Sequence, residues 1–123
     1  MMAGEQTIVV VDDERDIREL LALVLESEGY AVIAVAHAHE VLDILATRQV
    51  DLLITDFHMP EMNGAALIAG VRASHPRLPI ILASGQRGIA AVAASCGANE
   101  CFQKGSPISR LLDLVATVLQ KSG

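Results

Sequence analysis

Aromatic residues are scarce in this sequence: tryptophan is absent, and the 123 residues include one tyrosine and two phenylalanines. The stacking platforms on which single-strand nucleic-acid binders hold their bases are therefore missing. Positive charge is also scarce, since nine lysines and arginines stand against fifteen aspartates and glutamates, for a net charge of -6. Because this balance repels phosphate backbones and anionic membranes, we expect no direct nucleic-acid binding.

Cysteine is limited to Cys96 and Cys101, which are too few for a disulfide framework and have no metal-type spacing to a histidine. We interpret both as small buried hydrophobic residues of a protein in the reducing cytoplasm. No stretch approaches the roughly 18 apolar residues of a membrane span, and the first residues lack a leader pattern. We therefore expect a cytoplasmic protein that does not insert into membranes.

What the sequence does contain is enough apolar material for one folded core. Its hydrophobic content is 52%, its mean hydropathy is +0.44, and 20% of its residues are charged. These values exclude a disordered chain and leave enough polar surface for a globule. A chain of this length lies within the size of one ordinary domain, so we expect residues 1–123 to form a single domain.

Short apolar runs alternate with stretches of helical spacing along the chain. The first run, 8–11, is β-branched without alternation, which is typical of a strand buried on both faces of a parallel sheet. Five such units predict an α/β fold in which a parallel sheet is sandwiched between helices. The predicted strands are 8–11, 31–35, 51–55, 79–83 and 100–103, and the predicted helices lie around 17–24, 41–45, 67–71, 89–96 and 111–119. We expect the last helix to have Ser106 as its N-cap and Pro107 in its first turn.

Polar residues follow four of the predicted strands. Asp12 and Asp13 close the first, Asp56 the third, Ser84 the fourth and Lys104 the fifth. In a parallel sheet these ends meet at one edge, which is where ligands bind. Three carboxylates within a few ångströms repel by roughly 4 kcal/mol per pair at an effective dielectric constant of about 20, so they hold a proton or bind a cation. All-oxygen ligands with room for phosphate favour Mg²⁺.

The same residues include the chemical groups that phosphoryl transfer requires. An aspartate carboxylate can attack a phosphoryl group while an ammonium neutralises its oxygens and a hydroxyl donates a hydrogen bond. Asp56, Lys104 and Ser84 would take these roles. Taken singly, each residue is more simply explained as a helix cap, a turn residue or solvated surface, and only the combination favours function.

Longer motifs carry a resemblance to a known family. Residues 9–14 (VVVDDE), residues 56–64 (DFHMPEMNG), Ser84-Gly85, and Gly97-Ala98 before Lys104 resemble the receiver domain of two-component response regulators, over essentially the whole chain. The resemblance implies a flavodoxin-like three-layer sandwich with five helices and a sheet of strand order 2-1-3-4-5. The domain would be a single-domain regulator similar to those of chemotaxis, or the receiver of a hybrid histidine kinase.

The resemblance also implies roles for individual residues. Asp56 would be the phospho-acceptor, and Asp12, Asp13, Asp56 and the backbone carbonyl of His58 would bind Mg²⁺, while the lysine and serine named above would face the phosphoryl group. The phosphoryl donor would be a phosphohistidine on a sensor histidine kinase or histidine phosphotransfer protein. Partner binding would switch at the face of the fourth helix, fifth strand and fifth helix. The domain would be no enzyme but a phospho-acceptor that assists its own phosphorylation and dephosphorylation.

Three features depart from the family pattern. Cys101 stands where an aromatic switch residue is usual, and Phe102, one step later, should pack in the core because a one-residue offset reverses the facing side. Gly105 stands where a proline with a cis bond is usual, and we expect a trans bond and a relaxed loop. The stretch 84–97 is short and rich in glycine and alanine, so its helix should be short or mobile, which leaves open whether the domain signals through another surface.

Two other functions remain as alternatives. A phosphatase with an aspartyl intermediate normally has a second aspartate two residues after the nucleophile, where this chain has His58. An FMN-binding flavodoxin-like domain would need phosphate donors where the first strand is followed by acidic residues. The His58 side chain either faces solvent or influences attack by water on the phosphoryl group. His37 and His39 are interpreted as surface loop residues rather than metal ligands.

Overall fold

The computed structural model describes residues 5–60, 62–85 and 87–122, with side chains up to residue 120. Within these residues five strands alternate with five helices, as the apolar pattern predicts. The elements are β1 (Thr7–Val11), α1 (Arg15–Ser27), β2 (Ala31–Val35), α2 (Ala38–Thr47), β3 (Leu52–Asp56), α3 (Gly64–Ser74), β4 (Ile80–Ser84), α4 (Ile89–Cys96), β5 (Glu100–Gln103) and α5 (Ile108–Ser122). No helix among the described residues is both long and apolar enough to cross a membrane.

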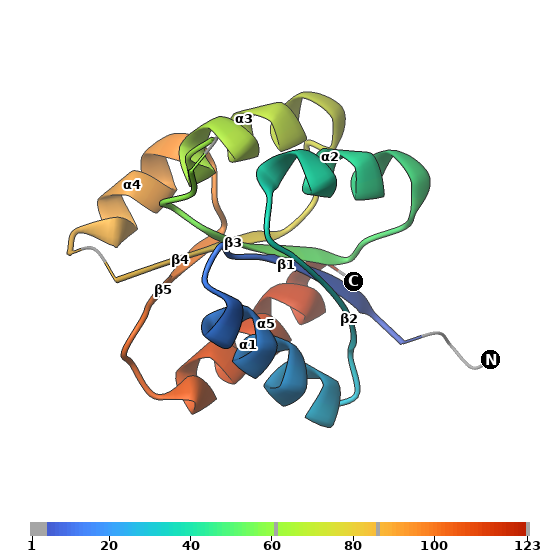
Figure 1. Ribbon diagram of the computed structural model, residues 1–123, viewed down its shortest axis with the longest axis vertical. Coiled ribbons are helices and arrows are strands. Elements are labelled where there is room, and N and C mark those ends of the chain that lie inside the picture. The colour runs from blue at the N-terminus through green and yellow to red at the C-terminus, as the bar shows by residue number, and fades with distance from the viewer. Residues whose placement is uncertain (1–4, 61, 86, 123) are drawn as a thin grey trace.

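The sheet confirms the predicted fold class. All strand pairs are parallel, and the strand order is β2-β1-β3-β4-β5. Helices α2, α3 and α4 cover one face and α1 and α5 cover the other, which makes three layers (Figure 1). Since every strand runs in the same direction, the carboxyl ends of all five lie at one edge of the sheet.

Two aliphatic cores lie on the two faces of the sheet. Successive side chains of a strand point to opposite faces, so Val9 and Leu53 pack under α2 and α3 while Ile8 and Ile54 pack against α1 and α5. These four side chains are at most 1% exposed. The central strands are therefore buried on both faces, as the unbroken β-branched run 8–11 predicts for β1.

The fifth strand confirms two predictions about the departures from the family pattern. Phe102 is 5% exposed and packs in the core beside α1 and α5, whereas Cys101 is half-buried against the opposite core. The bond before Gly105 is trans, and Gly105 has φ +97°, a left-handed conformation that suits glycine. The helix after Ser84, α4, has eight residues and is the shortest of the described helices.

Three local predictions were wrong. His39 lies in the first turn of α2 rather than in a loop, because the buried side chain of Ala38 anchors the helix before its main apolar stripe begins. The rings of His37 and His39 stack with centroids 5.6 Å apart. The cysteines are half-buried rather than buried, since Cys96 ends α4 and Cys101 lies in the edge strand β5, where both pack only at the border of the core. The last helix begins at Ile108, so Pro107 lies just before its first turn rather than in it.

Candidate functional site

The predicted convergence of polar residues at the carboxyl edge of the sheet is confirmed. Asp56 and Ser84 are the last residues of β3 and β4, Asp12 and Asp13 directly follow β1, and the backbone N–H of the residue after β5, Lys104, donates to the Ser84 carbonyl at 2.9 Å. One carboxylate oxygen from each aspartate lies within 4.8 Å of the other two. Asp12 is 1% exposed and Asp56 is 6% exposed, so two of the three carboxyls are buried.

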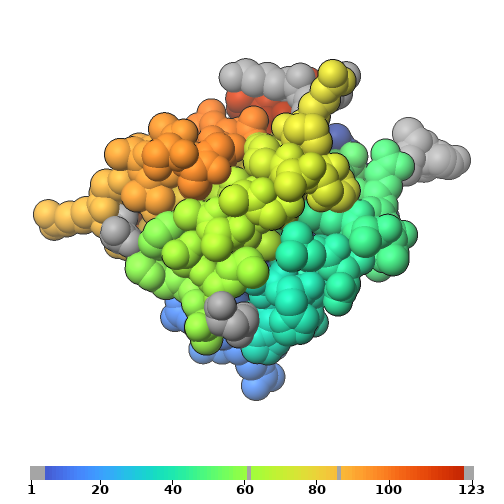
Figure 2. Space-filling model, turned by 90° about the horizontal axis from the view of Figure 1, so that it is seen from above, coloured from blue at the N-terminus to red at the C-terminus, as the bar shows by residue number. Residues whose placement is uncertain are grey.

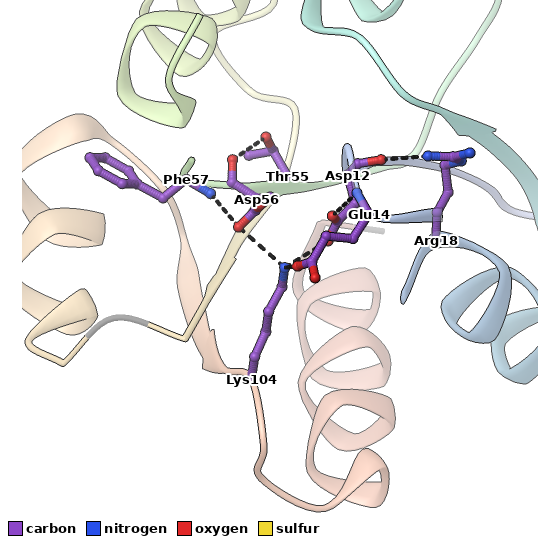
Figure 3. Close-up of polar contacts among 7 residues, drawn as sticks. All are labelled: Asp12, Glu14, Arg18, Thr55, Asp56, Phe57 and Lys104. Atoms are coloured by element: carbon purple, nitrogen blue, oxygen red, sulfur yellow. Dashed lines mark hydrogen bonds and ion pairs between the residues drawn. The ribbon is translucent and has the colours of Figure 1, made fainter. Parts of the chain in front are cut away.

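Lys104 lies among these carboxylates (Figure 3). Its Nζ is 2.8 Å from Asp12 Oδ2, 3.3 Å from Asp56 Oδ1 and 3.4 Å from Glu14 Oε1. From the sequence we expected the negative charge of this cluster to be neutralised by a proton or a bound cation. In the structure, Lys104 neutralises part of that charge. That contribution was not expected, because the reach of a lysine side chain cannot be deduced from its position in the sequence.

Backbone and side-chain hydrogen bonds hold the two buried carboxyls in place. Asp12 Oδ1 accepts from the backbone N–H two residues further along, and Asp56 Oδ1 accepts from the N–H of Phe57, both at 2.9 Å. Arg18 Nη1 donates to the backbone carbonyl of Asp12 at 2.8 Å, and the Thr55 hydroxyl donates to the carbonyl of Asp56 at 2.9 Å (Figure 3). The site is thus built into the strand ends and does not depend on loop conformation alone.

Burial and charge act in opposite directions on the two ionisable groups at the centre. Burial raises the pKa of Asp56, and the neighbouring charge of Asp12 adds to this effect, while Lys104 and the Phe57 N–H partly counteract it. For Lys104, burial alone lowers the pKa, but the hydrogen bond and charge of Asp12 together with Asp56 outweigh burial and leave the pKa above its ordinary value. The surroundings therefore favour the charged form of Lys104 and disfavour the charged form of Asp56.

A close approach of the backbone explains one glycine at the site. Gly64 begins α3, and its N–H donates to the Phe57 carbonyl at 2.7 Å. A Cβ at this position would lie 2.7 Å from the backbone oxygen of Asp56 and 3.0 Å from Phe57 Cα. Glycine therefore lets the start of α3 pack directly against the end of β3, next to the buried carboxyl.

The carboxyl edge opens into a cavity of about 440 Å³. His58 is exposed, and its ring makes an edge contact with Phe57 at a centroid distance of 4.9 Å. The three aspartates form the cluster of potential metal ligands found in the described part of the chain, and His37 and His39 are not part of it. The cavity is lined by Asp13, Glu14, Asp56, His58, Ser84, Gly85 and Lys104.

Sequence reasoning missed two contributors to the site. Glu14 was noted only as part of a motif, yet it pairs with Lys104 and lines the cavity. Its place beside the aspartate pair was a signal that could have found it. Arg18 was not considered, and its contact with the Asp12 carbonyl depends on how α1 leaves the sheet, for which the sequence has no local sign.

The sequence model of the response regulator receiver domain matches residues 8–116. This chain belongs to that family. The response regulator protein PilR of Pseudomonas aeruginosa is 34% identical over 119 residues, which make up 95% of this chain and 27% of that protein. The response regulator protein FleR of the same organism is 34% identical over 111 residues, or 89% of this chain and 24% of that protein. This receiver domain thus spans about a quarter of the length of these relatives.

Solved structures show the same fold. The response regulator protein TrrA of Thermotoga maritima, in complex with Mg²⁺-BeF, has a TM-score of 0.85 and 30% identity, and the match covers 92% of this chain and 98% of that one. A CheY-like receiver domain protein of Methanospirillum hungatei has a TM-score of 0.90 and 25% identity, with 97% of each chain covered. The flavodoxin-like receiver fold expected from the sequence is confirmed.

Family membership confirms the function class. This is a signalling domain of two-component systems, and neither the phosphatase nor the FMN-binding alternative is favoured. Receiver domains bind Mg²⁺ in an acidic pocket, and they are phospho-acceptors that histidine kinases phosphorylate. The cluster in this chain fits such an ion, because all its side-chain ligands are carboxylate oxygens and its repulsion is only partly offset by one lysine.

Proposed function

We propose that this receiver domain accepts one phosphoryl group on Asp56, with Mg²⁺ held by Asp12, Asp13, Asp56 and the backbone carbonyl of His58. The observation that carries the proposal is the position of the Asp56 carboxylate. It is 6% exposed, lines an open cavity, and has an ammonium 3.3 Å away and two further carboxylates within 4.8 Å. No other carboxylate of the cluster is both buried and lining that cavity in the described residues.

The chemistry follows from these groups. A carboxylate oxygen of Asp56 bonds to phosphorus, the phosphorus–nitrogen bond of the donor phosphohistidine breaks, and its electron pair leaves with the imidazole. Lys104 moves its charge from the carboxylates towards the phosphoryl oxygens, and the Ser84 hydroxyl donates a hydrogen bond to them. Bound Mg²⁺ supplies further positive charge to those oxygens. The same groups would serve hydrolysis, in which water attacks the phosphorus, the bond to the Asp56 oxygen breaks and inorganic phosphate leaves. The domain would thus assist its own phosphorylation and dephosphorylation without being a turnover enzyme.

The proposal includes two kinds of protein partner. The phosphoryl donor is a sensor histidine kinase or a histidine phosphotransfer protein. The downstream partner, whether a separate protein or another part of a longer chain, binds the face of α4, β5 and α5. Since Cys101 replaces the usual aromatic residue, we place the link to this face in Ser84 and the following Gly85, whose carbonyl accepts from Gln103 of β5 at 3.3 Å. We further propose that residues 1–123 form one domain, and its cytoplasmic location stays a prediction.

Intact-protein mass spectrometry tests the acceptor assignment. The domain is incubated with Mg²⁺ and acetyl phosphate, and we expect the mass of one phosphoryl group to be added. Asp56→Asn should abolish the gain, whereas the matched control Asp113→Asn, an exposed carboxylate on α5, should retain it. A gain that survives Asp56→Asn contradicts the assignment. Repeating the incubation in EDTA tests the metal requirement.

The role of His58 needs its own experiment. Its side chain lines the cavity beside Asp56, so we propose that it influences attack by water on the acyl phosphate. His58→Ala should change the lifetime of the phosphorylated domain by about tenfold, less than the roughly 10²–10⁴-fold that a full general acid or base contributes. An unchanged lifetime leaves the solvent-facing alternative as the correct one.

A further inference from the structure

The amino edge of the sheet, opposite the acidic site, has a second cavity of about 440 Å³. It lies between the segment that follows α2 and the segment that follows α3, seen in green and yellow at one end of the face in Figure 2. Arg48 contributes from the first segment, and His75 and Arg77 from the second. The cavity thus gathers cationic and potentially cationic side chains in a protein of net charge -6.

The two arginines of this cavity have their charges open to solvent. Both Arg48 and Arg77 are exposed, and neither forms an ion pair within the described residues. By contrast, Arg15 pairs with a glutamate at 2.9 Å. The cavity also contains the carboxylate of Asp51, but its Oδ2 already accepts the backbone N–H of Thr7 at 2.8 Å. Because two guanidinium groups and one carboxylate line the cavity, a net positive charge remains for an anion.

Apart from Gln49, the remaining lining of the cavity is apolar, and the segment after α3 is held in shape. Leu45, Leu78 and Pro79 are buried and form part of its lining. Arg72 Nη1 donates to the carbonyls of His75 and Leu78 at 3.2 and 2.6 Å, which fixes the segment that carries Arg77. His75 Nδ1 shares a 2.8 Å hydrogen bond with Ser74, so its Nε2 is the ring nitrogen left for another partner. Apolar walls with a few convergent polar groups are typical of small-molecule sites.

We propose that this cavity binds a small organic anion, with Arg48 and Arg77 holding a carboxylate or phosphate group and the apolar walls holding its body. The planar guanidinium fork matches both kinds of anion. At the acidic edge a phosphate would be held through Lys104 and Mg²⁺, whereas this cavity would hold an anion through its arginines. This binding requires neither Asp56 nor phosphorylation and goes beyond the proposed function.

Amide chemical shifts of the full chain in Mg²⁺-free buffer test the proposal, with three probes. Phenyl phosphate and benzoate combine an anionic group with an apolar body, and they separate phosphate from carboxylate preference. Inorganic phosphate lacks the body and should bind about tenfold or more weakly than phenyl phosphate. We expect saturable shifts confined to residues 48–51 and 75–79. Shifts that do not saturate, or that centre on the acidic edge, overturn the proposal.

Variants test the role of the arginines. Arg48→Gln and Arg77→Gln should each raise the dissociation constant of the better probe by about tenfold, as expected for the loss of one charge-assisted contact. Arg110→Gln, the same charge change at an exposed site on α5, should leave it unchanged. An equal effect of Arg110→Gln would show a response to net charge only and overturn the site. If either variant fails to fold, the lysine variant replaces it and should weaken binding less, because it keeps the charge but loses the fork.

Discussion

The two edges of the sheet hold their charges in different ways. At the carboxyl edge, Asp12 and Asp56 are nearly inaccessible and are compensated at short range by Lys104. At the amino edge, Arg48 and Arg77 are exposed and are compensated by solvent. A charge removed from water needs a fixed partner, whereas an exposed one does not. Substitutions at the carboxyl edge should therefore change folding stability and chemistry together, and those at the amino edge should change binding alone.

The largest expected effect comes from removing the charge that neutralises the carboxyl edge. Lys104→Met should lower the free energy of unfolding by about 2–3 kcal/mol in Mg²⁺-free buffer, because it leaves the buried carboxylates of Asp12 and Asp56 without their cation. Adding Mg²⁺ should restore part of this loss if the dication binds the same carboxylates, as proposed. Urea unfolding with and without Mg²⁺ measures both. An unchanged stability would contradict the view that the carboxyl edge is stabilised by a buried charge pair. Lys104→Arg is the control, because it keeps the positive charge.

A second test concerns the close packing behind the acidic site. Gly64→Ala should lower the free energy of unfolding by about 2 kcal/mol, because its Cβ would lie 2.7 Å from the backbone oxygen of Asp56 and force β3 and α3 apart. Gly70→Ala, in the same helix, is the matched control. Its Cβ would meet only Leu42 at 3.9 Å, so the variant should gain about 0.5–1 kcal/mol from helix propensity. Equal effects of the two changes would disprove the packing argument.

The raised pKa of Asp56 leads to a pH-dependent prediction with a definite sign. The folded state binds the proton of the Asp56 carboxyl more tightly than the unfolded chain does. The contribution of this proton to folding stability is therefore fully present below the ordinary pKa, and it is lost as pH rises through the higher pKa of the folded state. At neutral pH without Mg²⁺, Asp56→Asn should therefore increase stability by about 1 kcal/mol. The gain should shrink as pH falls into the acidic range. Thermal unfolding at several pH values measures it, with Asp113→Asn as control.

The smallest effect is expected at the amino edge. Replacing both Arg48 and Arg77 with glutamine should change the free energy of unfolding by no more than about 0.5 kcal/mol, as is usual for exposed side chains without fixed partners. Arg72→Gln is the informative comparison, because Arg72 donates to the carbonyls of Gly97 and Leu78 and should cost about 1–3 kcal/mol. A large loss in the double variant would mean that the amino edge is also built on buried charge.

Much of the fold could be predicted because its signals are local and repeated. The run 8–11 already indicates a strand buried on both faces. Glycine and proline residues mark several of the turns between the elements of the fold. Family motifs then supplied the strand order, which the apolar pattern alone does not specify. Errors occurred where local signals were weak: His39 was placed in a loop because a helix start at Ala38 has no capping side chain to mark it.

The candidate site was predicted to a similar extent. The rule that the ends of parallel strands share one edge was enough to predict that Asp12, Asp56 and Ser84 lie together. It could not show that Lys104 Nζ would lie 2.8 Å from an aspartate, or that Arg18 would hold the Asp12 carbonyl. Such contacts depend on rotamers and on the path of neighbouring helices, and these are decided by packing.

The order of apolar and polar residues along the chain was enough to predict five parallel strands that end at a common acidic edge. The reason is that each secondary structure has a fixed side-chain period, which the apolar residues of the sequence follow. Only the tertiary structure decided how those acids are neutralised. Lys104 and Asp12 are distant in sequence, and their charges meet because β5 and β1 both end there. The cavity between Arg48 and Arg77 likewise exists only because the segments after α2 and α3 are folded side by side at the opposite edge.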